Sequence, residues 1–146
     1  MFIKSGPKNK NMKRLLLLDM DLTIVDSNKA GILAYKKVLK KHGLKMPTHR
    51  ELKGVSGMER KEKIEYFYPE LNNKQTETVC NEIAKVLMGE TTKYVKAFPG
   101  IKGTLKKLSK NYELGIASNA NHKRIVAYLN KVGIDLRLFE VIIGND

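Results

Sequence analysis

Residues 15–27 read LLLLDMDLTIVDS, and this stretch decides the fold. The four consecutive leucines, Leu15 to Leu18, show no alternation of apolar and polar residues. A short continuous apolar run is typical of a strand buried on both faces, as in the centre of a parallel sheet. The run ends on two carboxylates, Asp19 and Asp21, and open α/β sheets bind ligands just beyond the carboxyl ends of their strands. We therefore expect a site at this end of the strand.

Two more apolar runs, residues 112–117 and 139–144, predict short strands, and helical patterns follow Pro99 and Asn121. Strands that are joined by helical crossovers lie parallel, because such connections are almost always right-handed β-α-β units. The predicted fold class is therefore α/β, with a Rossmann-like parallel sheet in which three core strands are present.

The long segment between the first and second strands, residues 28–96, contains helical patterns and no good strand. Ser27 or Asn28 can cap its first helix, and Thr48 and Glu51 have the spacing of a capping box. The predicted organisation is a flexible basic arm over 1–13, an α/β core over 14–27 and 97–146, and a helical unit over 28–96 inserted into the core.

Asp19, Asp21 and Thr23 form the pattern Asp-x-Asp-x-Thr after an apolar strand. This pattern resembles the first signature of the haloacid dehalogenase-like phosphohydrolases, although Leu22 stands where that family usually has glycine. The helices of residues 28–96 resemble the α-helical cap of one branch of the family. The segment Phe98-Pro99-Gly100 is similar to the hinge of the branch that resembles phosphoglycolate phosphatase.

The resemblance implies a Mg²⁺-dependent phosphatase that hydrolyses a small phosphorylated metabolite. Asp19 would be the nucleophile that carries a transient aspartyl-phosphate, and Asp21 would be the general acid and base. Asp19 and Asp21 would also hold the Mg²⁺. Ser118, which closes the second strand, matches the second motif of the family and would bind a phosphate oxygen together with Asn119.

Two later features of the family pattern have no match: a lysine near the nucleophile and a fourth strand with acidic metal ligands. Lys123 and Asp146 are poor substitutes because of their positions in the chain. The family's fourth strand pairs with the first, so we expect the strand of residues 15–18 to present an open apolar edge. The expected explanations are an incomplete or inactive copy, completion by a second chain, or strand sharing in a homodimer.

Other functions stay open at this point. A catalytically dead phosphate-binding or interaction protein is consistent with the missing motifs, and a phosphomutase would use the same pair of acids. The dehalogenase branch is disfavoured, because it keeps no acid at the position of Asp21. The loop over residues 54–60 could contact a substrate, but Arg60 and the nearby lysines are expected to be merely solvated.

The composition and charge of the chain indicate which kinds of molecule it binds. The net charge is +13, from 28 basic and 15 acidic residues, but the lysines are scattered, and neither a helix-turn-helix nor a zinc-ligand pattern is present. We therefore expect a solvated basic surface that attracts anionic substrates rather than a nucleic-acid site. The single cysteine, Cys80, excludes an internal disulfide and fits the cytoplasm. No apolar run approaches the roughly 18 residues of a membrane span.

Overall fold

The structure is a computed structural model that describes residues 14–55 and 57–146, so the predicted arm over 1–13 lies outside the described residues. The elements in chain order are β1 (Arg14–Leu18), β2 (Val25–Asp26), α1 (Asn28–Lys41), α2 (His49–Gly54), α3 (Arg60–Phe67), α4 (Asn73–Met88), η1 (Thr92–Tyr94), β3 (Lys96–Ala97), α5 (Ile101–Leu108), β4 (Tyr112–Ala117), α6 (His122–Lys131), η2 (Leu136–Leu138) and β5 (Phe139–Ile143).

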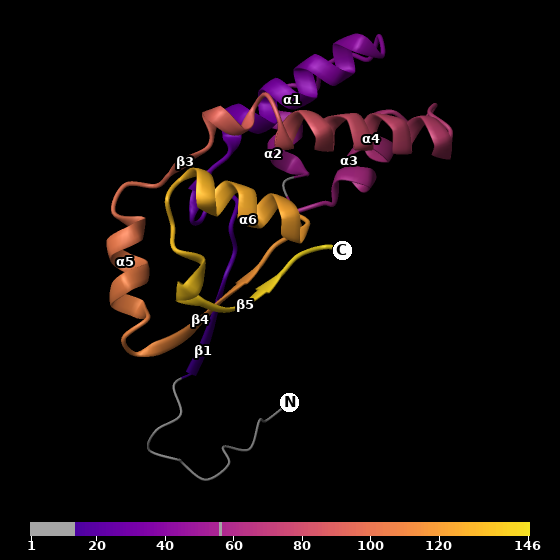
Figure 1. Ribbon diagram of the computed structural model, residues 1–146. Helices are drawn as coiled ribbons and strands as arrows, with labels where there is room; N and C mark the ends of the chain where they lie inside the picture. Colours follow the sequence, from indigo (N-terminus) through magenta and orange to yellow (C-terminus); the bar gives the residue numbers. More distant parts are fainter. Residues whose placement is uncertain (1–13, 56) are drawn as a thin grey trace, which may run out of the picture.

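The three long strands form one parallel sheet in the order β1-β4-β5, which confirms the predicted α/β class (Figure 1). Leu18 at the end of β1 pairs with Ile116, and Ala117 at the end of β4 pairs with Ile143. The carboxyl ends of β1 and β4 therefore lie side by side. This register brings the residues that follow the two strands, Asp19 and Ser118, to the same edge of the sheet.

One face of the sheet is packed against helices α5 and α6. Leu114 and Ile116 of β4 are buried in a single apolar cluster with Leu105 of α5 and Ile125 of α6, and Leu16 of β1 packs against it. Successive side chains of a strand point to opposite faces, so this cluster uses alternate residues of each strand. The helices thus hold the carboxyl ends of the strands in fixed positions.

The opposite face of β1 is open, and the prediction of a strand buried on both faces is wrong for the described chain. Leu15 is 52% exposed and Leu17 is 49% exposed. The cause is the strand order, which places β1 at the edge of the sheet, and the packing of α5 and α6 on one face only. The prediction of an open apolar edge is confirmed for the described residues.

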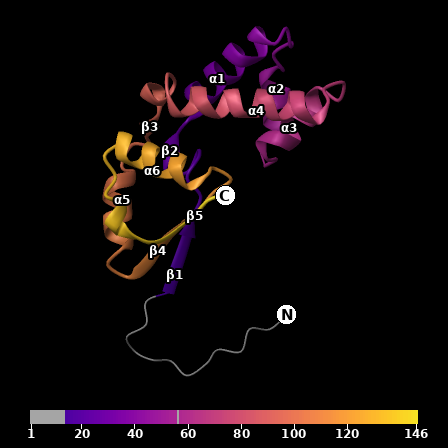
Figure 2. The ribbon, with the colours of Figure 1, turned by 45° about the vertical axis from the view of Figure 1, so that its right-hand side comes forward.

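In the chain, helices α1 to α4 come between the short strands β2 and β3, which pair antiparallel through Val25 and Ala97; the helices lie together on the far side of this ribbon from the sheet (Figure 2). These helices have an apolar core of their own, which is separate from the core under the sheet. Its buried residues are Ala34, Val38, Leu39, Ile64, Tyr68, Val79, Ile83 and Leu87. The two-stranded ribbon is therefore the stem that joins a small helical unit to the α/β sheet.

The capping signals read from the sequence had different outcomes. Thr48 and Glu51 form the predicted capping box at the start of α2. Ser27 occupies the N-cap position of α1, but its side chain makes no cap hydrogen bond, because its hydroxyl donates to Asp21 instead.

Within residues 14–55 and 57–146, no helix has the length and apolar character that crossing a membrane would require.

Candidate active site

The turn after β1 directs two carboxylates away from the core. Met20 and Ile24 are fully buried, and the Met20 carbonyl accepts hydrogen bonds from the backbone N–H groups of Ile24 (2.9 Å) and Val25 (3.1 Å). Because these two apolar side chains anchor the turn, the intervening acids Asp19 and Asp21 line the cavity beyond the strand. The buried side chains of Met20 and Ile24 thus fix the turn in the orientation that points the acids toward the cavity.

Leu22 gives this turn its unusual backbone geometry. Its φ of 60° lies in the left-handed region, and among the described residues other than glycine it alone has a positive φ. Its N–H donates to the Val25 carbonyl at 2.8 Å. The position at which this chain departs from the family's usual glycine therefore keeps the backbone conformation that glycine adopts most easily.

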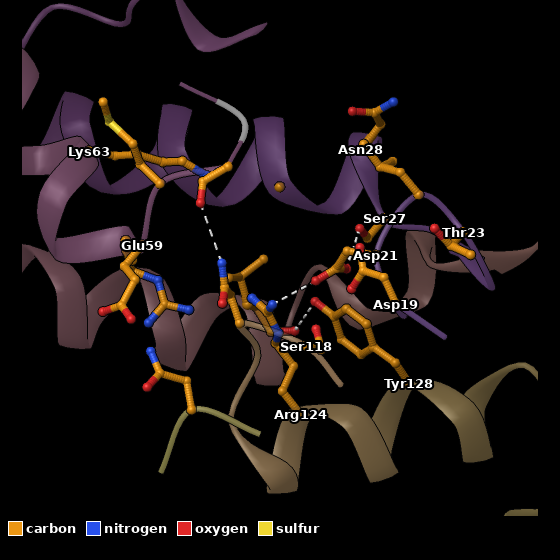
Figure 3. Close-up of a pocket in the computed structure, with 18 of the residues that line it drawn as sticks. Asp19, Asp21, Thr23, Ser27, Asn28, Glu59, Lys63, Ser118, Arg124 and Tyr128 are labelled. Carbon is orange, nitrogen blue, oxygen red and sulfur yellow. Dashed lines mark hydrogen bonds and ion pairs between the residues drawn. The ribbon is translucent and has the colours of Figure 1, made fainter. Parts of the chain in front are cut away.

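Both oxygens of the Asp21 carboxylate accept hydrogen bonds (Figure 3). The Ser27 hydroxyl donates to Oδ1 at 2.5 Å, and Nη2 of Arg124 donates to Oδ2 at 2.7 Å. The neighbouring carboxylate of Asp19 accepts a hydrogen bond on Oδ1 from the N–H of Met20 at 2.7 Å. The two acids therefore differ: Asp21 is fixed by an ion pair, whereas Oδ2 of Asp19 accepts no hydrogen bond from the described residues.

The second wall of the cavity comes from the segment after β4. The Ser118 N–H donates to the Ile143 carbonyl at 3.1 Å, which fixes the residue at the end of the sheet. Its hydroxyl oxygen accepts from the N–H of Ala120 at 3.2 Å. Asn119 lies next to it and donates weakly to the Gly57 carbonyl of the helical unit at 3.5 Å. Ser118 and Asn119 thus face the same cavity as the two acids.

The cavity has a volume of about 990 Å³ and lies between the sheet and the helical unit. The helical unit contributes charged side chains from the start of α3, including Arg60 and Lys63. The expectation that Arg60 is merely solvated is wrong, because Arg60 is half-buried and lines this cavity. Burial, together with the charge of Arg124, lowers the pKa of Arg60. Burial also lowers the pKa of Lys63, and the charges of Arg124 and Arg60 add to this effect.

The sequence-predicted site residues Asp19, Asp21, Ser118 and Asn119 all line this one cavity, as does Thr23. Asp146 instead caps α6, because its Oδ1 accepts from the His122 N–H at 2.9 Å. Sequence reasoning missed Arg124, which lies in the first turn of the helix that follows the Ser118 segment. A signal was present, since the start of a helix after a parallel strand lies at the ligand-binding edge of the sheet.

The carboxylates fit a magnesium ion only in part. Asp19 and Asp21 offer the hard oxygen ligands that Mg²⁺ prefers, and this ion commonly binds through one or two carboxylates, waters and substrate phosphate. Among the residues that the structure describes, no three His, Cys, Asp or Glu side chains gather as a metal-binding group. The described residues could therefore hold Mg²⁺ together with water and phosphate oxygens, but they do not form a closed cage.

A parallel sheet, a helical unit inserted after its first strand and paired acids at that strand's end define a Rossmann-like α/β protein with a helical cap. Residues 16–146 match the sequence model of the family described as "Haloacid dehalogenase-like hydrolase". The chain therefore belongs to the haloacid dehalogenase-like hydrolase family.

Individual relatives support this assignment. The chain is 32% identical over 140 residues to a phosphoglycolate phosphatase of Aquifex aeolicus (strain VF5), and the match covers 91% of the chain and 61% of that relative. A solved haloacid dehalogenase-like hydrolase from Bacteroides fragilis is 25% identical with a TM-score of 0.81, and the match covers 91% of this chain and 63% of that one.

A further solved structure shares the fold. CbbY from Rhodobacter sphaeroides, solved in complex with phosphate, is 17% identical with a TM-score of 0.75, and the match covers 92% of this chain and 64% of CbbY. The described chain thus spans less than two thirds of the length of these relatives.

Proposed function

We propose that the protein is a phosphatase that hydrolyses a small phosphate monoester through an aspartyl-phosphate on Asp19. The observation that carries this proposal is the shared cavity of Asp19, Asp21 and Ser118 at the carboxyl ends of two adjacent parallel strands. Membership of the haloacid dehalogenase-like hydrolases and similarity to a phosphoglycolate phosphatase support the same chemistry.

Asp19 is the proposed nucleophile because one of its oxygens is held and the other is available. Met20 N–H fixes Oδ1, which orients the carboxylate, and Oδ2 is then the atom that attacks phosphorus. The new bond joins Oδ2 to phosphorus while the bond from phosphorus to the ester oxygen breaks. Water then attacks the phosphoryl group, which releases inorganic phosphate and restores the carboxylate.

Asp21 is the proposed proton carrier. It would give a proton to the departing alcohol oxygen and later take one from the attacking water, so that no net proton remains on the protein. In the described structure its carboxylate is held by Ser27 and Arg124. For proton transfer, one of these hydrogen bonds has to be exchanged for a contact with the substrate.

The Ser118 hydroxyl and the Asn119 amide are the proposed ligands of the transferring phosphoryl group. Neutral donors that point at phosphate oxygens stabilise the charge that develops there during transfer. The proposed cofactor is Mg²⁺ held by Asp19 and Asp21, and when bound it neutralises phosphate charge and reduces repulsion from the two carboxylates.

A second candidate function is phosphate binding without turnover. It is favoured by one observation, namely that both oxygens of the Asp21 carboxylate are already occupied by Arg124 and Ser27.

The single cysteine fits our proposal of a cytoplasmic location. We also propose that another chain, either a second copy or a separate polypeptide, covers the open edge of β1.

Hydrolysis of an aryl phosphate and of phosphoglycolate by the 146-residue chain, with and without Mg²⁺, tests the proposed function. Asp19→Asn should lower the rate at least about 1,000-fold, as the loss of a covalent nucleophile does elsewhere. Asp26→Asn is the matched control. Asp26 follows the same turn, but its carboxylate accepts a hydrogen bond from the Asn28 N–H and does not line the cavity. Equal rates for Asp19→Asn and the unchanged chain would rule out the proposed nucleophile.

The intermediate offers a second readout. Acid-quenched protein should carry the added mass of one phosphoryl group at Asp19 during turnover. Binding of the esters with no turnover and no such adduct would favour the second candidate function.

A further inference from the structure

Exposed apolar side chains gather around the candidate active site. In the part of the chain that the structure describes, nine large apolar side chains are exposed, and four of them line the cavity: Leu22, Ile32, Met58 and Ile143. Ile32 is 41% exposed and Met58 is 37% exposed. Open apolar surface beside a few convergent polar groups is typical of a ligand-binding cavity. The cavity therefore offers contacts to an apolar group as well as to an anion.

Helix α1 leads from Asp21 into the helical unit. It begins directly after Ser27, whose hydroxyl donates to Asp21 at 2.5 Å. Gly31 and Ile32 lie about one turn along the helix and Tyr35 about two turns along, and all three line the cavity. Residues three and four positions apart lie on one side of a helix. A substrate group that extends from Asp21 along α1 therefore meets these three residues.

Ile32 differs from the rest of the exposed surface of α1. The other exposed residues of this helix are Asn28 and lysines, as is usual for a face that contacts water. Beside Ile32, Gly31 leaves room, because a Cβ at this position would meet no atom within 4 Å. Glycine in a helix interior is less stable than alanine, so it contributes space here and not helix stability. The cavity side of α1 thus combines an exposed apolar side chain with open space next to it.

The charged side chains of the helical unit come from another element. Glu59, Arg60 and Lys63 line the cavity from the start of α3. Figure 3 shows Glu59 and Lys63 displaced to one side of Asp19 and Asp21. The helix of this unit that begins beside Asp21 is instead α1, with its apolar residues.

We propose that Ile32, Tyr35 and Met58 form an apolar subsite that binds an alkyl or aryl group on the alcohol side of the substrate. This inference rests on the proposed function and names its substrate class: phosphate monoesters of apolar alcohols. Asp21 is the proposed donor of the proton to the departing oxygen, so the alcohol extends from the Asp21 side of the phosphoryl group. Contact with Ile32 and Met58 then removes apolar surface of both partners from water, which favours binding.

Two phosphonates that the protein cannot hydrolyse, hexylphosphonate and ethylphosphonate, test this inference by calorimetry in the presence of Mg²⁺. They carry the same charge and differ only in the length of the alkyl chain. We expect the unchanged protein to bind hexylphosphonate at least about tenfold more tightly, as partial burial of the longer chain allows. Ile32→Gln should reduce this preference to about threefold or less, because an amide replaces the apolar surface.

Met88→Gln is the matched control for Ile32→Gln. Met88 is also an apolar helix residue and is 39% exposed, but it ends α4 and does not line the cavity. The preference for hexylphosphonate should survive in this variant.

Gly31→Leu tests where the alkyl chain lies. Leucine suits a helix, and its side chain would take up the open space beside Ile32. This variant should bind hexylphosphonate at least about fivefold more weakly and ethylphosphonate within about twofold of the unchanged protein. Gly103→Leu is the control, because Gly103 lies in α5 and also has open space but does not line the cavity. It should change the binding of neither phosphonate.

Equal binding of the two phosphonates by the unchanged protein, or failure to bind either one, would overturn the inference. A preference that survives in folded Ile32→Gln or folded Gly31→Leu would also overturn it, and thermal melting reports whether each variant is folded. If Ile32→Gln does not fold, the comparison of Gly31→Leu with Gly103→Leu decides the outcome alone. A preference for hexylphosphonate without hydrolysis of any ester would count against the proposed function only, because phosphonate binding requires no turnover.

Discussion

Arg124 and Asp21 form an ion pair across the candidate active site, with 2.7 Å between Nη2 and Oδ2. The two residues are 103 positions apart in the sequence and come from α6 and from the turn after β1. The Arg124 side chain is 14% exposed and that of Asp21 is 29% exposed, so solvent screens the pair less than it screens the surface pairs of this protein. The pair therefore links the start of α6 to the proposed catalytic turn.

The first prediction concerns the stability that this pair contributes. We expect a coupling free energy of about 1–2 kcal/mol between Asp21 and Arg124, between the values for exposed and buried pairs. Urea unfolding of Asp21→Asn, Arg124→Met and the double variant measures it as a double-mutant cycle. The control cycle, Lys41→Met with Glu82→Gln, should give a smaller coupling, because the Lys41 side chain is 65% exposed. Equal coupling in both cycles would contradict the prediction.

The second prediction separates two glycines. A Cβ atom at Gly144 would lie 2.6 Å from the His122 backbone nitrogen and 2.8 Å from the Ala120 carbonyl oxygen. Backbone atoms cannot move aside as a side chain can, so Gly144→Ala should lower the free energy of unfolding by about 1–3 kcal/mol. Gly103→Ala should raise it by about 0.5–1 kcal/mol, because Gly103 lies within α5 and a Cβ there has open space. Thermal or urea unfolding measures both, and a harmless Gly144→Ala would show that the close packing is absent.

The third prediction concerns Leu22, whose φ of 60° disfavours a side chain. A left-handed conformation costs a residue other than glycine about 1–2 kcal/mol, and glycine recovers part of this cost against its own larger loss of chain entropy. Because the Leu22 side chain is 51% exposed, little packing is lost on its removal. We expect Leu22→Gly to raise the free energy of unfolding by up to about 1 kcal/mol and Leu22→Val to lower it. A loss of stability in Leu22→Gly would show that the side chain contributes more than the strain costs.

Much of the fold and part of the site could be predicted from local sequence patterns. The apolar runs at 112–117 and 139–144 predict β4 and β5 closely, and the acids Asp19 and Asp21 share a cavity with Ser118 as expected. These features depend on residues that are near one another in the chain or on the general geometry of parallel sheets. Such information is present in a single sequence.

The charge distribution of the site could not be predicted in the same way. The sequence analysis did not single out Arg124, and it expected Arg60 to be solvated. Their places in the site depend on how α6 and α3 pack around the cavity: Arg124 pairs with Asp21, and Arg60 lines the same cavity from the helical unit. The same limit explains the error at β1, where exposure depends on which strands and helices cover it rather than on its own leucines.

The fourth prediction is a loss of stability at high pH. Burial raises the pKa of Tyr68 to about 12 and that of Tyr128 to about 12. Above pH 10.0, the ordinary tyrosine pKa, the unfolded chain loses these protons while the native protein keeps them. The native state then binds more protons, so its stability falls as the pH rises from about 10 toward 12.

Urea unfolding at several pH values between 8 and about 12 checks this fourth prediction. Tyr68→Phe and Tyr128→Phe should each make the fall with pH shallower. Tyr66→Phe is the matched control, because Tyr66 is 63% exposed and should leave the slope unchanged. An identical slope in all three variants would show that other groups, such as the many lysines, cause the whole pH dependence.

The fifth prediction is that the open edge of β1 makes the 146-residue chain self-associate. Among the residues that the structure describes, no strand pairs with the outer edge of β1, and Leu15 and Leu17 of this strand are 52% and 49% exposed. An exposed apolar edge strand is a template for pairing with another chain. We expect the apparent mass in size-exclusion chromatography to rise with concentration above the 16.6 kDa of one chain.

A lysine on the exposed face of an edge strand opposes such pairing, because association would bring like charges together and bury an ammonium group. Leu17→Lys should therefore shift the elution toward the monomer at the same concentration. Met88→Lys is the matched control, since Met88 is also apolar and 39% exposed but ends α4, far along the chain from the edge. A monomer at every concentration would argue against an edge that needs a cover. Association that Met88→Lys reduces as strongly as Leu17→Lys would point to general charge repulsion instead, as the net charge of +13 allows.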